Sequence, residues 1–349
     1  VDYDALAGGG VGAAAGVSGG SAAGGSDGGT SGVAGSGGGP GGEGGASGGS
    51  SGQGGSGGVG GGGEGGDAGQ GGGRTCQDLP TPPSCAIDLD CNGTSCCHTG
   101  LVPGGTFPMG RSEDGSDDVP SDPVVQSQMD ERPEHDAFVS DFCLDTFEVT
   151  VGRFRQFVEA HYDDGVALEP GAGAHPQIPG SGWDAAWDAL LPADRGALDA
   201  ALDCDGEPTW TPGYGSQETL PLNCVTWYLA AAFCAWDGGR LPTEAEWEKA
   251  AAGGDENRRF AWGDNNPGDS LCIFNQQPLQ IAGSRPQGSG RWGQRDLIGS
   301  VAEWTLDYYA GTWYQFDGHA CSDCANLADT TTRVVRGGSF RTSQSAYLR

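Results

Sequence analysis

Residues 238–254 read GGRLPTEAEWEKAAAGG, and this stretch gives the clearest helix signal in the chain. Thr243 and Glu246 have the T-x-x-E spacing of a capping box, in which each side chain accepts a hydrogen bond from a backbone N–H of the first helical turn. The paired glycines at the end of the stretch predict the end of the helix, because glycine readily adopts the left-handed conformation of a C-cap. The apolar face of this helix is predicted to comprise Trp247, Ala250 and Ala251.

Shorter elements are predicted on both sides of this helix. A second helix is predicted from Thr226 to Trp236, and residues 182–202 predict one or two short helices. Thr150 can N-cap a further helix, and the alternating residues before it predict strands. The rest is rich in Gly, Pro and Trp, so we expect an α+β domain with little regular secondary structure and many loops.

The N-terminal part has a different composition. Residues 1–73 are dominated by Gly, Ser and Ala and cannot bury enough apolar surface to offset their ordering entropy, which predicts a disordered tether. Residues 74–99 form a small Cys-rich segment, and residues 100–349 hold the main domain. No run of about 18 apolar residues exists, so no membrane span is predicted.

The charge balance bears on partners. The net charge is −30, which argues against nucleic-acid binding, because that needs a basic surface. It also argues against docking to anionic lipid. An acidic surface suits solubility or calcium binding.

The chain has 12 cysteines, which indicates disulfides and an oxidising compartment: extracellular, periplasmic or cell-surface. Cys204 and Cys224 flank one loop and are predicted to pair. Cys321 and Cys324 form a C-x-x-C, which is either a structural disulfide, a redox pair or half of a zinc site. The adjacent pair at 96–97 is either a redox switch or two cysteines with different partners.

Four blocks resemble the formylglycine-generating enzyme (sulfatase-modifying factor) family. They are DTFEVTVGRFRQFVEA (145–160), WYLAAAFCAWDGGRLPTEAEWEKAAAGG (227–254), DLIGSVAEWTLDYY (296–309) and RVVRGGSF (333–340). The second block is the most specific, because its G-G-R-L-P-T-E-A-E-W-E run is nearly unbroken. The resemblance implies an irregular α+β domain akin to C-type-lectin-like domains. It also implies that the chain stops before the family's last strands, which leaves Cys234 unpaired.

The family oxidises a sulfatase cysteine to formylglycine with oxygen and copper, which two active-site thiolates hold. Thiolates are soft ligands that select Cu(I). Those cysteines follow the R-G-G-S block at C-x4-C spacing, and the corresponding residues here are Thr342 and Tyr347. Neither residue can bind Cu(I) as a thiolate does, so we expect no copper site. Ser339 is retained, either as a polar group beside the reaction centre or as a turn residue after two glycines.

The resemblance also implies a structural calcium site. The family's N-x2-G-x-[AV]-x-E loop corresponds here to DLIGSVAE, in which Asp296 and Glu303 supply carboxylates and Gly299 and Val301 supply backbone carbonyls. Oxygen-only ligation suits a hard cation such as Ca²⁺. The alternative is that Glu303 only hydrogen-bonds the loop. The family's second calcium site needs a longer loop than residues 263–290 provide, and it is not expected.

Three functions are compatible with these features. The first is a non-catalytic family member that binds a protein or glycan ligand. The second is an oxidase that works without the copper thiolates, and the third is a structural or adhesive surface module on a glycine-rich stalk. The missing cysteines favour the first and third hypotheses over the second.

Overall fold

A computed structural model describes residues 76–112, 114, 115, 119, 130–204 and 207–348. The predicted tether, residues 1–73, lies outside these described residues.

The strands in the described part of the chain are short and pair antiparallel. The pairs are β1 (Thr99–Val102) with β4 (Phe142–Asp145), β2 (Gly105–Met109) with β3 (His135–Val139), and β5 (Glu303–Tyr308) with β6 (Arg333–Arg336). Each pair is a separate two-stranded sheet, so no large sheet organises these residues. The expectation of an irregular α+β domain is confirmed.

The α-helices are α3 (Val151–Val158), α4 (Arg195–Ala201), α5 (Trp227–Trp236) and α6 (Glu244–Ala252). The α3 helix continues into a π-helical turn at Glu159–Asp163, and short 3₁₀ turns lie at Cys76–Asp78, Pro83–Ala86, Ala185–Leu190, Gly254–Glu256, Pro286–Gly288, Trp313–Gln315 and Ser345–Tyr347. The helices predicted after Thr150, Thr226 and Thr243 are confirmed, and each threonine hydroxyl accepts a hydrogen bond from its helix.

The α6 helix has the predicted cap at both ends. Both hydrogen bonds of the capping box between Thr243 and Glu246 are present, and Gly253 closes the helix with a φ of +71°. Glu246 also accepts two hydrogen bonds from Arg240, both of 2.6 Å. Burial alone raises the pKa of Glu246, but hydrogen bonds from His175 and Arg240 outweigh it and lower that pKa to about 2. Glu246 is therefore ionised at neutral pH.

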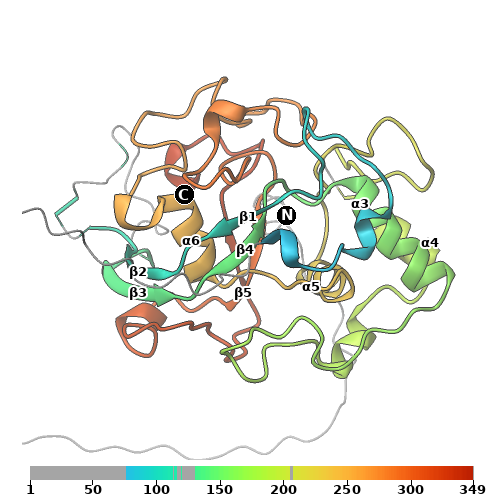
Figure 1. Cartoon of the computed structure of the whole chain (residues 1–349), viewed down its shortest axis with the longest axis horizontal. Helices are drawn as coiled ribbons and strands as arrows, with labels where there is room; N and C mark the ends of the chain where they lie inside the picture. The colour runs from blue at the N-terminus through green and yellow to red at the C-terminus, as the bar shows by residue number, and fades with distance from the viewer. Residues whose placement is uncertain (1–75, 113, 116–118, 120–129, 205–206, 349) are drawn as a thin grey trace, which may run out of the picture. The chain divides into compact units, whose positions relative to one another are not determined.

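The domain buries two main apolar clusters. Figure 1 shows the helices that supply their residues. The first gathers residues of α6, β2 and β3 around Trp247, which is 1% exposed. The second gathers α3, α4 and α5 around Phe154 and Phe157. Large aromatic residues fill both clusters, as the tryptophan content predicts.

Disulfides fasten the Cys-rich segment. Cys76 pairs with Cys143 of β4, while Cys85–Cys97 and Cys91–Cys96 close loops within the segment. The cysteines at 96 and 97 thus have different partners. The predicted pair Cys204–Cys224 is confirmed, and the C-x-x-C is a disulfide between Cys321 and Cys324.

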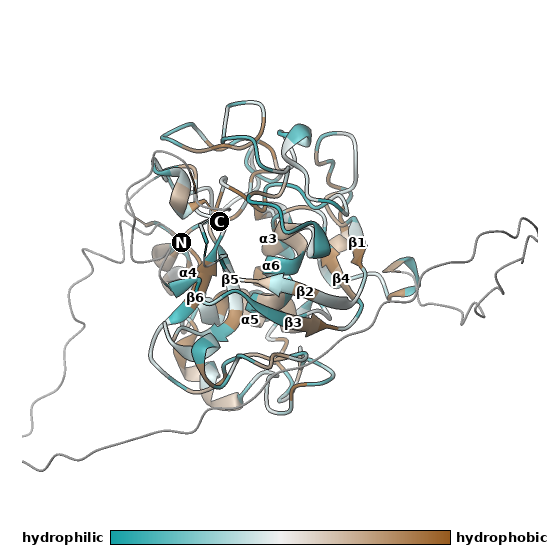
Figure 2. Ribbon diagram, turned by 90° about the vertical axis from the view of Figure 1, so that its left-hand side faces the viewer, coloured by the Kyte–Doolittle hydropathy of each residue, from teal (hydrophilic) through white to brown (hydrophobic). Residues whose placement is uncertain are grey.

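Figure 2 shows apolar and polar stretches following one another closely along the ribbon. None of the helices within the described ranges has the length and apolar character needed to cross a bilayer.

Glu246 gives a stability prediction. We expect Glu246→Ala to lower the free energy of unfolding by about 3 kcal/mol, because it removes the buried partner of Arg240. Thr243→Ala should cost only about 1 kcal/mol, as for loss of one N-cap. Urea unfolding with unchanged m-values measures both, and equal losses in the two variants would contradict the central role of Glu246.

Candidate functional site

The pairing of β5 with β6 brings two of the sequence blocks together. Glu303, the first residue of β5, lies opposite Arg336, the last residue of β6. Gly337 and Gly338 follow with φ values of +84° and +67°, and a Cβ on Gly337 would lie 2.4 Å from the carbonyl oxygen of Leu297. Glycine is therefore required where the chain leaves β6 and turns into Ser339.

Ser339 begins a tight turn. Its backbone N–H donates to Oγ1 of Thr342 at 2.9 Å, and the N–H of Thr342 donates back to the carbonyl of Ser339 at 2.9 Å. The Ser339 hydroxyl accepts the N–H of Arg341 at 3.3 Å. These are the contacts of a turn residue, and a role of Ser339 beside a reaction centre stays a prediction.

Thr342 and Tyr347 both border Gly338. A Cβ on that glycine would lie 3.2 Å from Oγ1 of Thr342 and 2.6 Å from the carbonyl oxygen of Tyr347. The Tyr347 side chain is 42% exposed. The two positions at which the family resemblance places its thiolates thus lie near one another and carry hydroxyl groups instead.

No other thiol in the described residues replaces them. Cys234 and Cys272 are the free cysteines there. Burial raises the pKa of both thiols to about 12, so both are protonated at neutral pH. Cys272 is 1% exposed, and neither thiol has the character of a reactive thiolate.

The loop at 296–303 is held in an unusual backbone conformation. Asp296, Gly299 and Ser300 all have positive φ, at 60°, 83° and 56°. The Gly299 N–H donates to the carbonyl of Gly337 at 2.8 Å, and a Cβ on Gly299 would lie 2.4 Å from the carbonyl oxygen of Ile273. The loop is therefore fitted closely between residue 273 and the end of β6.

Three carboxylates lie at this loop. Asp296 accepts the N–H of Gly283, and Glu303 accepts the indole N–H of Trp247 at 2.8 Å. Glu148 is the residue that the sequence did not reveal. Its two oxygens accept the Ser300 hydroxyl and the Val301 N–H, both at 2.9 Å. The available signal was an acidic residue between two apolar ones, Phe147 and Val149, in the first sequence block.

Burial is the largest influence on the pKa of each of these acids, and Arg295 and Arg285 offset it in part at Asp296. Burial, with a contribution from the charge of Asp296, raises the pKa of Glu303 to about 7. Burial likewise raises the pKa of Asp296, and it raises the pKa of Glu148 well above its ordinary value, with help from the other two charges. A cation at the loop would offset this cost.

The predicted calcium ligands fit a hard cation in their chemistry. Within the described residues, one oxygen each of Asp296 and Glu303 accepts no hydrogen bond, and neither does the carbonyl of Gly299 or Val301. The side chains do not form a preformed cage, since among these same residues no three His, Cys, Asp or Glu side chains lie close enough together to hold a metal. The ligands would have to draw together around the ion.

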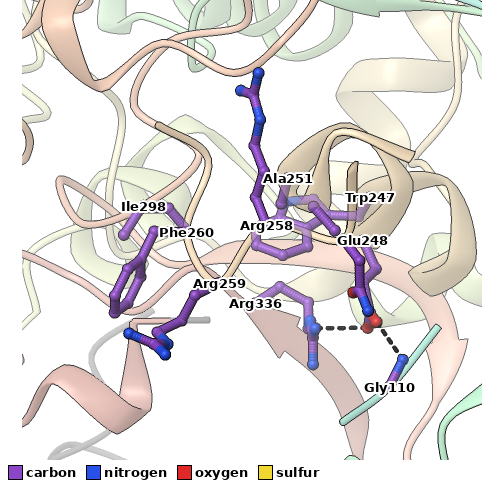
Figure 3. A pocket seen from close by; sticks show the side chains of 11 residues that line it. Gly110, Trp247, Glu248, Ala251, Arg258, Arg259, Phe260, Ile298 and Arg336 are labelled. Atoms are coloured by element: carbon purple, nitrogen blue, oxygen red, sulfur yellow. Dashed lines mark hydrogen bonds and ion pairs between the residues drawn. The ribbon is translucent and has the colours of Figure 1, made fainter. Parts of the chain in front are cut away.

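Trp247 also lines a small pocket, together with Ile298 of this loop (Figure 3). The pocket is lined by Phe260, Ile298, Glu248, Arg336 and their neighbours, and its volume of about 20 Å³ suits one water molecule rather than a substrate. The Arg336 guanidinium donates to Glu248 at 2.8 Å, while the Arg258 side chain points away from Arg336. The arginines therefore do not converge on a common anion.

Comparison with known proteins places this geometry in context. The model of the family described as "Sulfatase-modifying factor enzyme 1-like domain" matches residues 88–349. The formylglycine-generating enzyme of Streptomyces coelicolor is 32% identical over 273 residues, covering 68% of this chain and 77% of that protein. The "Inactive C-alpha-formylglycine-generating enzyme 2" of Bos taurus is 30% identical over 268 residues, covering 68% and 75%.

Other proteins are similar over part of the chain. The serine/threonine-protein kinase pkn1 of Chlamydia caviae is 28% identical over 216 residues, which are 62% of this chain. The chain spans only 31% of that kinase's length. Among solved structures, PvdO from Pseudomonas aeruginosa has a TM-score of 0.46 at 21% identity, with 71% of this chain and 86% of that one covered.

The raised pKa of Glu303, from 4.5 to about 7, predicts a pH dependence. The folded chain keeps a proton that the unfolded chain releases over this range, so the free energy of unfolding should fall as pH rises from about 4.5 to 7 in metal-free buffer. Glu303→Gln keeps an acceptor for Trp247 but cannot ionise. We expect this substitution to remove about 3 kcal/mol of the decline in the free energy of unfolding, measured by urea unfolding across pH. Parallel pH profiles for the two proteins would contradict this.

Proposed function

The chain belongs to the family of sulfatase-modifying factor enzyme 1-like domains, and we propose that it is a non-catalytic member that binds a protein or glycan ligand. The observation that carries this proposal is the pair Thr342 and Tyr347. They occupy the positions of the family's copper thiolates, border the same glycine and offer only hydroxyl groups. The scaffold around them is kept, with the turn at Ser339 closed by its own hydrogen bonds.

The relatives include both kinds of protein. One is named as a formylglycine-generating enzyme and another as an inactive one, so membership of the family does not decide activity. The copper-dependent oxidase is the alternative function, which the identity to the Streptomyces coelicolor enzyme favours. A copper-independent oxidase or a structural module would share the same scaffold.

We also propose that Ca²⁺ binds the loop at 296–303 as a structural ion. Asp296 and Glu303 would supply carboxylate oxygens, and Gly299 and Val301 backbone carbonyls, which suits a hard cation. When bound, the ion supplies positive charge to a loop that holds several buried acids. Support comes from the raised pKa values of these acids and from the oxygens that accept no hydrogen bond within the described ranges.

The proposed location is outside the cytoplasm: extracellular, periplasmic or on the cell surface. Five disulfides in the described part of the chain support an oxidising compartment.

The non-catalytic proposal predicts no aldehyde formation. We expect the full chain, incubated with Cu(I), oxygen and a sulfatase peptide that contains cysteine, to leave the peptide mass unchanged, because no thiolate pair holds copper. Mass spectrometry of the peptide measures this. The Streptomyces coelicolor enzyme serves as the positive control, and aldehyde formation by this chain at a comparable rate would overturn the proposal.

The calcium proposal predicts stabilisation by the ion. Ca²⁺ at about 100 times its dissociation constant should stabilise the native state by about 2.7 kcal/mol, because it binds only the folded loop. Thermal melting in Ca²⁺ and in chelator measures the shift. We expect Asp296→Asn with Glu303→Gln to abolish it, while Asp255→Asn, an exposed acid elsewhere, keeps it. An equal shift in both variants would show that the ion binds elsewhere.

A further inference from the structure

We propose that Glu148 is a positioning residue that links cation binding at the loop 296–303 to the order of the turn 339–342. This inference rests on the proposed calcium site and extends it. It assigns to Glu148 a role that neither the spacing of the predicted ligands nor the family resemblance supplies.

Glu148 is anchored by the scaffold on both sides. It is 8% exposed and lies between β4 and α3. The residue after it, Val149, accepts the N–H of Leu222 at 2.9 Å, and Thr150 caps α3. On the other side, the carbonyl of Thr146 accepts the N–H of Arg295 at 2.8 Å. The carboxylate therefore projects from a fixed segment of backbone.

Both oxygens of Glu148 are already used by the loop. One accepts the Ser300 hydroxyl and the other accepts the Val301 N–H, each at 2.9 Å. Glu148 thus acts on the loop through Ser300 and Val301, and it is assigned no place among the cation's ligands.

The peptide unit that joins Ser300 to Val301 is held at both ends. Its N–H donates to Glu148, and its carbonyl oxygen, that of Ser300, accepts the N–H of Phe340 at 2.7 Å. A peptide unit is planar and rigid, so its two ends move together. Phe340 lies inside the turn 339–342, and the loop and the turn therefore share this one peptide.

The same peptide unit lies between the two carbonyls proposed as cation ligands. Gly299 supplies the carbonyl before it and Val301 the carbonyl after it. Ser300 also holds a φ of +56°, which costs energy in a residue other than glycine and persists only where the surroundings enforce it. Glu148 is one of the groups that enforce it. A cation that draws in the two carbonyls would tighten the bond from Phe340 to Ser300.

The test compares three variants of the full chain. Glu148→Ala removes both acceptors. Glu148→Gln keeps an oxygen for Val301 and an amide that can donate to Ser300. Asp323→Ala is the matched control, because Asp323 also accepts one backbone N–H and one hydroxyl, both from Ser140, at 2.6 and 2.7 Å. It belongs to a different loop.

Calcium affinity, from titration calorimetry, should fall about 10- to 100-fold in Glu148→Ala, as when a group that orients metal ligands is lost. Glu148→Gln should stay closer to the natural chain than to Glu148→Ala, and Asp323→Ala should match the natural chain. An equal loss in Glu148→Gln and Glu148→Ala would overturn the positioning role, since charge alone would then explain the effect. Should Glu148→Ala not fold, Ser300→Ala, which removes one of the two bonds, is expected to weaken binding, and unchanged affinity in it would count against the proposal.

Hydrogen exchange measures the link to the turn. Ca²⁺ should slow exchange in peptides covering residues 337–342 in the natural chain and in Asp323→Ala, and it should do so far less in Glu148→Ala. If Ca²⁺ does not change the exchange rate at 337–342 in the natural chain, although calorimetry shows that Ca²⁺ binds, this inference is overturned and the calcium proposal is not. No calcium binding by the natural chain would overturn both.

Discussion

Buried carboxylates that accept hydrogen bonds from backbone N–H groups hold this domain together. The described sheets have two strands each, so much of the backbone lies in loops whose polar groups no ladder can pair. An unpaired buried N–H is costly, and a carboxylate is a strong acceptor for it. Glu148 accepts the N–H of Val301 in the loop, and Asp307 accepts the N–H groups of Glu244 and Asn326 at 2.7 and 2.8 Å.

A buried carboxylate also holds the Cys-rich segment against the domain. Asp237, after α5, accepts the N–H and the hydroxyl of Ser84, both at 2.8 Å. Arg153 of α3, which is 2% exposed, lies between Asp237 and Asp145 at 2.8 and 2.6 Å and forms an ion pair with each. The segment has little apolar content of its own, so these contacts and its disulfides take the place of a core.

This construction explains how the scaffold can persist without the thiolates of the family. The turn after β6 depends on Gly337, on Gly338 and on hydrogen bonds within residues 339–342, and a hydroxyl at position 342 serves that turn directly. The loop opposite depends on Gly299 and on Glu148. None of these requirements involves a cysteine at 342 or 347. The residues present at 342 and 347 therefore leave the surrounding backbone with its partners, and the proposed cation loop is a neighbour of the turn rather than a part of it.

Features that depend on local interactions could be predicted from the amino-acid sequence. Helix α6 with its capping box, the helices after Thr150 and Thr226, and the loop-closing pair Cys204–Cys224 all depend on residues near one another in the chain. Only the tertiary structure decided the contacts between distant segments. Glu148 accepts a hydrogen bond from Val301, 153 positions away, and Cys76 forms a disulfide with Cys143, 67 positions away. No spacing in the sequence predicts these two contacts. Such contacts form because the buried polar groups of irregular loops need hydrogen-bond partners. The packing of the whole chain determines which partner lies near each loop.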